Sequence, residues 1–192
     1  MSEDNLIDTR EGDELLEERI LSSEIAHQGG FLRVDAVDIE LPNGHRTTHE
    51  VVRHPGAVAI IALDNQGRVL LVHQYRTALE RMTVEIPAGK LDRGEDPLEC
   101  ALRELSEETG YIAERMEYLM PIAVAAGYSD EIIHLYMASG LSAGPAHPDD
   151  DEFGVAEWVP LDTLVDSVLD GRIEDSKTVI AALICDSLRH RV

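Results

Sequence analysis

Three closely spaced glutamates, Glu104, Glu107 and Glu108, are the residues of this sequence best suited to chemistry. If their segment is helical, Glu104 and Glu108 lie one turn apart with Glu107 farther round, so three carboxylates crowd one side of the helix. Such like-charge neighbours destabilise a helix unless a positive group lies between them. Magnesium prefers oxygen ligands and combines one or two protein carboxylates with water and phosphate oxygens. The cluster therefore predicts a divalent-metal site, with a merely solvated acidic face as the alternative.

The residues around the cluster specify a helix over 97–109. Asp96 can cap its N-terminus, Pro97 suits the first helical position, and Glu99 completes a box-like cap. Gly110 can end the helix in a left-handed conformation. At about 100° per residue the apolar side chains form one stripe, which we expect to pack on a sheet. The stripe consists of Leu98, Ala101, Leu102, Leu105 and Thr109.

Residues 89–111 read GKLDRGEDPLECALRELSEETGY. This segment resembles the Nudix box at every fixed position, and seven such identities would recur by chance on the order of once in 10⁸ windows. The chain is identified as a member of the Nudix hydrolases. The resemblance implies an α/β fold, a Nudix α/β/α sandwich with a mixed sheet, and metal-dependent cleavage of a nucleoside-diphosphate-linked substrate. A catalytically silent Nudix module that binds a nucleotide is the alternative, which the complete set of glutamates disfavours.

The resemblance also implies roles for individual residues. Its metal ligands are Glu104, Glu107, Glu108 and the backbone carbonyl of Ala88, and the expected cation is magnesium, with manganese as the alternative. Arg103 precedes Glu107 by four residues and can reach back to Glu95, so we expect it to orient carboxylates in the catalytic group. Gly89 and Gly94 fit a loop that turns sharply or approaches the metal closely.

The segment VHQYRTALERMTVEIPAGKL, which leads into the box, resembles the ADP-ribose pyrophosphatase branch of the family. The matching residues are Gln74, Tyr75, Arg76, Glu85, Pro87 and Ala88. The resemblance implies that Arg76 and Tyr75 belong to the substrate site, with Arg76 on a phosphate. Glu85 is expected either to hydrogen-bond the nucleobase or to support the site. A surface arginine and a strand-edge acid are the plain alternatives.

The segment AAGYSDEIIHLYMASGL, after the box, resembles the same branch from Gly127 to Glu131. Gly127 and Ser129 are therefore expected in the substrate site. Ala126 stands where the branch usually has a proline that marks ADP-ribose specificity. The most fitting activity is hydrolysis of ADP-ribose to AMP and ribose 5-phosphate, and another sugar nucleotide such as GDP-mannose is the alternative substrate.

An acidic stretch, HPDDDEFG, precedes the last expected strand. In the family such a loop supplies another carboxylate to the metals or the attacking water. Glu152 is the first choice for this catalytic and metal-binding role, and Asp151 is the second. Asp149 and Asp150 are expected to be solvated.

The elements that must position these residues form one α/β domain behind an antiparallel N-terminal sheet. We expect a flexible terminus over 1–14, the N-terminal sheet over 15–53 and the Nudix domain over 54–192. Alternation through Leu32, Val34, Ala36 and Val37 indicates one of the N-terminal strands. In this branch the N-terminal sheet typically exchanges across a two-fold homodimer. The expected strands are 19–25, 31–41, 47–52, 57–63, 69–73, 116–124, 132–138 and 155–159, and the other expected helices are 161–169 and 177–189.

Composition limits the partners of the chain. It has 192 residues, 44% of them hydrophobic, which suits one principal folded domain. Its 16 basic and 38 acidic residues give a net charge of -22, which would repel polymeric nucleic acid and anionic membranes. The first residues lack the basic start and apolar run of a secretory signal, so a cytoplasmic location is expected. The two cysteines, Cys100 and Cys185, are expected to be reduced thiols.

Overall fold

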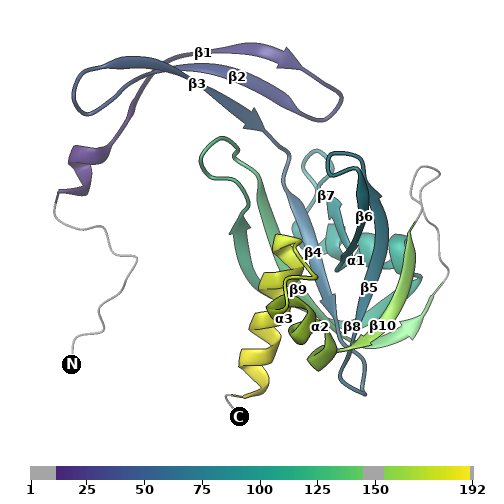
Figure 1. Cartoon of the computed structure of the whole chain (residues 1–192). Coiled ribbons are helices and arrows are strands. Elements are labelled where there is room, and N and C mark those ends of the chain that lie inside the picture. Colours follow the sequence, from purple (N-terminus) through teal and green to yellow (C-terminus); the bar gives the residue numbers. More distant parts are fainter. Residues whose placement is uncertain (1–11, 145–153, 191–192) are drawn as a thin grey trace. The chain divides into compact units, whose positions relative to one another are not determined.

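The structure is a computed structural model that describes residues 12–144 and 154–190. The chain divides into two compact units (Figure 1). The first comprises Met1–His54 and Ala125–Asp130, and the second comprises Pro55–Val124 and Glu131–Val192.

The first unit is an antiparallel three-stranded sheet in the order β1-β2-β3. A short 3-10 helix, η1 (Asp13–Leu16), precedes β1 (Arg19–Gln28), β2 (Arg33–Glu40) and β3 (Arg46–Arg53). The turn between β2 and β3 closes where the N–H of Gly44 donates to the carbonyl of Leu41 at 2.8 Å, with a φ of 81° at Gly44. Residues 125–130 return to β3, since the N–H of Val52 donates to the carbonyl of Tyr128.

Strand β2 lies within the predicted strand over 31–41. The buried residues of β2 are Asp35, Val37 and Ile39, on one face, whereas Leu32, Val34 and Ala36 are half-buried. Asp35 can lie on that face because Arg53 Nε donates to its carboxylate at 3.0 Å and Arg33 pairs with it as well. A buried carboxylate is tolerated when it is paired in this way.

The second unit contains two sheets and three helices. One sheet has the order β7-β4-β9-β8, and the other has the order β10-β5-β6. Strands β4 and β9 are parallel whereas their other neighbours are antiparallel, so the sheet is mixed. The strands are β4 (Ala57–Ala62), β5 (Arg68–Arg76), β6 (Arg81–Glu85), β7 (Ala88–Lys90), β8 (Tyr111–Ala123), β9 (Ile132–Ala143) and β10 (Val155–Pro160), and the helices are α1 (Pro97–Thr109), α2 (Leu161–Leu169) and α3 (Ser176–Arg189).

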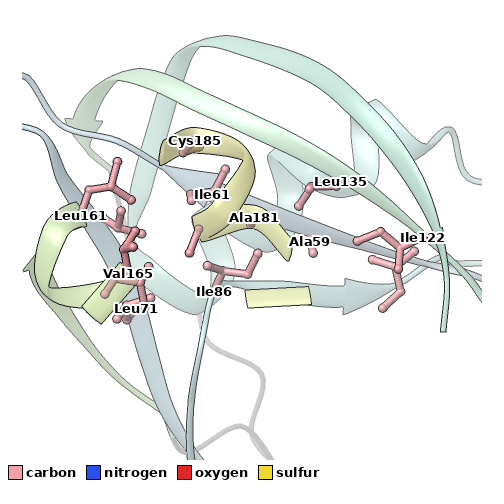
Figure 2. Close-up of a cluster of buried hydrophobic side chains, with 14 of the residues drawn as sticks. Ala59, Ile61, Leu71, Ile86, Ile122, Leu135, Leu161, Val165, Ala181 and Cys185 are labelled. Carbon is pink, nitrogen blue, oxygen red and sulfur yellow. The ribbon is translucent and has the colours of Figure 1, made fainter. Parts of the chain in front are cut away.

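Strand β4 is buried on both faces, which explains why its sequence, AVAIIA, holds no polar residue. Successive side chains of a strand point to opposite faces. Ala57, Ala59 and Ile61 therefore pack in the cluster of α2 and α3, which Figure 2 shows around Ala181 and Cys185. The intervening residues of β4 pack with α1. Helices thus cover both faces, and the predicted α/β/α sandwich is confirmed.

The three helices match their predicted ranges to within one residue, but two strands were missed. Strands β6 and β7 are short and are separated only by Ile86 and Pro87. Strand β8 starts at Tyr111, whereas the predicted strand started at residue 116. The prediction missed the first residues of β8 because they are mostly exposed and lack an apolar run. In the described part of the chain no helix is both long and apolar enough to cross a membrane.

Candidate active site

Helix α1 begins and ends as its sequence predicts. The carboxylate of Asp96 accepts the N–H of Leu98 at 2.9 Å, and Pro97 occupies the first turn. At the other end Gly110 adopts a φ of 71° and donates its N–H to Ser106. These caps fix which residues of the glutamate cluster lie within the helix.

The helix is rotated relative to the predicted apolar stripe. Leu98 and Leu102 are each 41% exposed, so their predicted packing against the sheet is wrong. The buried residues of α1 are Cys100, Ala101, Glu104 and Leu105. Cys100, Ala101 and Leu105 pack with β4 in the core. Glu104 and Glu108 face β7.

Glu104 is 6% exposed and packs directly against Gly89 in β7. An ideal Cβ at position 89 would lie 1.9 Å from Cδ of Glu104, so no side chain fits there. The glycine at the start of the box is therefore required by the close approach of a carboxylate. A left-handed backbone is not the reason, because Gly89 does not have a positive φ.

Glu108 contacts the same strand one helical turn further on. Its Oε2 accepts the N–H of Ala88 at 3.1 Å. Glu104 and Glu108 thus flank the short stretch formed by Ala88 and Gly89. The two carboxylates and the Ala88 backbone, which the sequence assigned to metal binding, lie together in the structure.

Arg103 joins the remaining acids of the box. Its Nε and Nη2 donate to the two carboxylate oxygens of Glu95 at 2.9 and 3.0 Å. Its Nη1 donates to Glu104 at 2.7 Å and to Glu107 at 2.9 Å. The Arg103 hydrogen bonds lower the pKa of Glu95 to about 2, and Glu95 in turn raises the pKa of Arg103. Both groups stay ionised at neutral pH.

The carboxylates fit a hard divalent cation in charge and in ligand type. Arg103 contacts three carboxylates, so this group has more negative than positive charge. All the side-chain donors are oxygens, which suit magnesium. In residues 12–144 and 154–190 no three acidic, histidine or cysteine side chains are already arranged as a metal site. Glu104 and Glu107 both accept a hydrogen bond from Arg103 Nη1, so the arginine holds these two carboxylates together.

Arg76 and Glu85 form a second polar group, on β5 and β6. Arg76 Nε and Nη2 donate to the two oxygens of Glu85 at 2.7 and 2.6 Å. The pKa of Arg76 is raised by these hydrogen bonds and further by the charges of Asp175 and Glu108.

Glu85 is 2% exposed and fully occupied as an acceptor. Besides Arg76, it accepts from Thr83 Oγ1 at 2.6 Å and from Lys177 Nζ. Four donors fill the roughly four lone-pair positions of a carboxylate. Burial alone would raise the pKa of Glu85, but Arg76 and Lys177 lower it to about 2. Of the two roles that the sequence left open, support of the site fits these contacts, since no lone pair remains for a nucleobase.

A cavity of about 700 Å³ opens beside this group. Four of the chain's 16 basic residues line it, together with four carboxylates, so its lining is neutral in a chain of net charge -22. The basic residues are Arg76, Arg81, Arg172 and Lys177. Sequence reasoning missed Lys177, because a lone lysine near the start of a helix is usually a solvated residue.

The other predicted site residues are distributed more widely. Tyr75 is 57% exposed and does not line the cavity. Gly127 and Ser129 belong to the first unit, where Ser129 forms a parallel bridge with Val52. Glu152 and Asp151 lie outside the described residues, as do Asp149 and Asp150.

The structure thus combines an α/β/α sandwich, a helix whose carboxylates face β7, and a cavity lined by both basic and acidic residues. A model of the NUDIX domain matches residues 53–183. The chain belongs to the Nudix family and is a Nudix hydrolase. Nudix hydrolases in general use divalent metal cations.

Relatives cover nearly the whole chain. It is 47% identical over 182 residues to the methanol dehydrogenase activator of Bacillus methanolicus. The matched region covers 92% of this chain and 98% of that protein. It is 40% identical over 168 residues to the ADP-ribose pyrophosphatase of Bacillus subtilis (strain 168), with 86% and 91% covered. The crystal structure of an ADP compounds hydrolase matches with a TM-score of 0.79 and 25% identity, covering 91% of this chain and 96% of that one.

Proposed function

We propose that this Nudix hydrolase converts ADP-ribose and water to AMP and ribose 5-phosphate, with Mg²⁺ as its cation and Mn²⁺ as the alternative. The observation that carries the proposal is the placement of the α1 carboxylates of Glu104 and Glu108 at Ala88 and Gly89 of β7, in the unit whose cavity Arg76 lines. A metal-bound diphosphate requires carboxylates on one side and a phosphate-binding cation on the other. The similarity to proteins named ADP-ribose pyrophosphatase and ADP compounds hydrolase supports ADP-ribose as the substrate.

The proposed metal ligands are Glu104, Glu108 and the carbonyl of Ala88, with Glu107 as a further ligand. A bound cation would neutralise charge on the diphosphate and lower the pKa of a bound water. Arg103 holds the carboxylates of Glu104 and Glu107 through Nη1 and is itself anchored by Glu95. We assign Arg103 a positioning role on these contacts.

Arg76 is proposed to bind a non-bridging phosphate oxygen. Water adds to one phosphorus atom, the bond from that phosphorus to the bridging oxygen breaks, and the bridging oxygen leaves with the other phosphate. Attack at either phosphorus gives the same two products, and the protons of the water pass to solvent or to a nearby base. Glu152 is proposed to align this water or to bind metal, with Asp151 as the alternative.

The cavity supports a nucleotide as the ligand. Its volume of about 700 Å³ lies within the roughly 300–1,000 Å³ of small-molecule sites. Its wall also includes apolar side chains, among them Leu79, Met82 and Val124. Apolar surface beside guanidinium groups suits a sugar or base attached to phosphate. Arg76 and the cavity wall therefore form the proposed substrate site, with Tyr75, Gly127 and Ser129 as predictions from the sequence.

We further propose a homodimer formed through the N-terminal sheet, with residues 15–53 as that subdomain and 54–192 as the Nudix domain. Strand β1 has no buried residue, and its Ile20 and Ile25 are 66% and 60% exposed. Apolar side chains exposed on a strand are typical of a surface that another chain covers.

The test is product analysis over a panel of substrates. Purified protein with Mg²⁺ is incubated with ADP-ribose, GDP-mannose and other nucleoside diphosphate sugars, and products are separated by anion-exchange chromatography. The proposal predicts the highest kcat/KM for ADP-ribose, with AMP and ribose 5-phosphate in equal amounts. A higher kcat/KM for GDP-mannose would show that GDP-mannose, and not ADP-ribose, is the substrate. Binding without turnover of any compound would indicate a silent nucleotide-binding module.

Similarity to the methanol dehydrogenase activator supports a second role, activation of a dehydrogenase. The two roles are compatible if activation depends on hydrolysis. Adding the protein and its Glu108→Gln variant to a methanol dehydrogenase assay tests the idea. Stimulation by the parent protein but not by Glu108→Gln would support activation that depends on hydrolysis. No stimulation by either protein would exclude the second role.

A further inference from the structure

Lys177 is a buried lysine at the start of α3. It is 6% exposed, and lysine is almost never buried at this level unless it is paired. Its ammonium contacts the carboxylate of Glu85 and donates to Asp175 Oδ1 at 2.8 Å. The lysine therefore connects the beginning of α3 to β6, which lies 92 positions earlier in the sequence.

Neighbouring contacts fix the same junction. Asp175 caps α3 by accepting the N–H of Thr178 at 3.0 Å, and Thr178 Oγ1 also donates to it at 2.6 Å. Thr178 Oγ1 in turn accepts the N–H of Ile86 at 2.9 Å. The first turn of α3 is thus attached both to Glu85 and to the next residue, Ile86.

The orientation of Arg76 depends on Glu85. A guanidinium has five N–H donors, and two of those on Arg76 point at Glu85. Lys177 holds Oε2 of Glu85, the oxygen that also accepts Arg76 Nη2. Any movement of Glu85 would therefore rotate the guanidinium and redirect its three other donors.

We infer that Lys177 is a positioning residue for phosphate binding: through Glu85 it fixes the guanidinium of Arg76 against the diphosphate. The inference rests on the proposed function for the identity of the ligand, and it deepens that proposal by making the first turn of α3 part of the substrate site. Lys177 acts through Arg76 and does not itself need to touch the substrate.

A double-mutant cycle tests this dependence. The four proteins are the parent chain, Lys177→Met, Arg76→Ala and the double variant. Lys177→Met is expected to lower kcat/KM for ADP-ribose about tenfold, mainly through a higher KM, which is typical of residues coupled in one hydrogen-bond network. The double variant is expected to be no worse than Arg76→Ala alone, because Lys177 has nothing left to position.

Two other variants separate positioning from stability. Thr178→Val removes the contact to Ile86 and the Oγ1 hydrogen bond to Asp175 but leaves the contact between Lys177 and Glu85. Its effect on kcat/KM should therefore add to that of Arg76→Ala. Asp175→Asn retains a good N-cap but weakens the hold on the ammonium, so it gives a milder form of the Lys177→Met result if that variant fails to fold. Additive losses for Lys177→Met and Arg76→Ala, or no loss in Lys177→Met and Asp175→Asn, would overturn the inference.

The same cycle on inorganic pyrophosphate, measured by isothermal titration calorimetry, keeps the inference separate from the proposed function. If the parent protein fails to hydrolyse ADP-ribose, the proposed function fails, yet pyrophosphate affinity still reports on Arg76. Non-additive losses of affinity in Lys177→Met and Arg76→Ala support the positioning role. Additive losses, or equal affinity in all four proteins, contradict it.

Discussion

The carboxylate of Glu104 occupies the space next to Gly89, where a Cβ would lie 1.9 Å from Cδ. Glu104 cannot move aside freely, because it is 6% exposed and accepts a hydrogen bond from Arg103. Gly89→Ala should therefore displace Glu104 and lower kcat by roughly 10- to 100-fold, the usual range when the support of a metal ligand is lost. Steady-state kinetics measure the loss of kcat, and a circular dichroism spectrum checks that the variant is folded.

Gly30→Ala is the matched control, since a Cβ at residue 30 has no heavy atom within 4 Å and its φ is not positive. It should keep full activity. Equal activity in Gly89→Ala and Gly30→Ala would show that the position of Glu104 does not matter for turnover.

Much of α1 could be predicted from sequence because its signals are local. Asp96, Pro97 and Gly110 set the two ends of the helix without help from the rest of the fold. The direction in which the helix faces is a tertiary property. Leu98 and Leu102 fit an apolar stripe, yet they are exposed, while Glu104 packs against Gly89 and Glu108 accepts the N–H of Ala88.

The contacts of Glu85 show how much of the polar group around Arg76 and Glu85 could be predicted from sequence. Arg76 and Glu85 could be singled out because a family motif contains both. Lys177 could not, since its partner lies 92 positions away and no periodic pattern links α3 to β6. Glu152 stays a prediction from the sequence, as it lies outside the described residues.

Glu95 should matter although it is not a proposed metal ligand. It holds both Nε and Nη2 of Arg103, so Glu95→Gln should free Arg103 to turn and should raise the Mg²⁺ concentration needed for half-maximal activity by about 10- to 100-fold. Magnesium titration of the initial rate measures this shift. Glu99→Gln, an exposed change on the same helix, should leave the titration unaltered. Identical titrations for both variants would contradict the anchoring role.

Glu85 should make stability depend on pH at the acid end. Its pKa is lowered from 4.5 to about 2, so its contribution to the free energy of unfolding is complete above pH 4.5 and is lost as pH falls toward 2. The shift corresponds to on the order of 3 kcal/mol. Glu85→Gln should therefore be less stable than the parent at pH 7 by a few kcal/mol, and the difference should narrow below pH 4.5.

Urea denaturation between pH 3 and 7 gives these free energies. The control is Glu174→Gln, whose ion pair with Arg81 is exposed and should contribute less than about 1 kcal/mol. A Glu85→Gln effect that is as small as that of Glu174→Gln, or that is constant with pH, would count against a tightly paired Glu85.

The proposed dimer can be tested on β1. Ile20→Asp and Ile25→Asp should shift the molar mass in light scattering toward the monomer, because each places a charge in an apolar interface. Leu183→Asp, on α3 and 41% exposed, should leave the mass of the assembly unchanged. A parent protein that is already monomeric would exclude the dimer.

The role of the α1 carboxylates is tested most directly by Glu108→Gln assayed with ADP-ribose and Mg²⁺. The amide oxygen of glutamine can still accept the N–H of Ala88, so the fold should persist while the metal-binding charge is lost. The account predicts a loss of kcat of at least about 100-fold, and complete loss of parental activity in excess chelator. Full activity of Glu108→Gln, or of the parent protein in chelator, would contradict a metal-dependent hydrolase built on this helix.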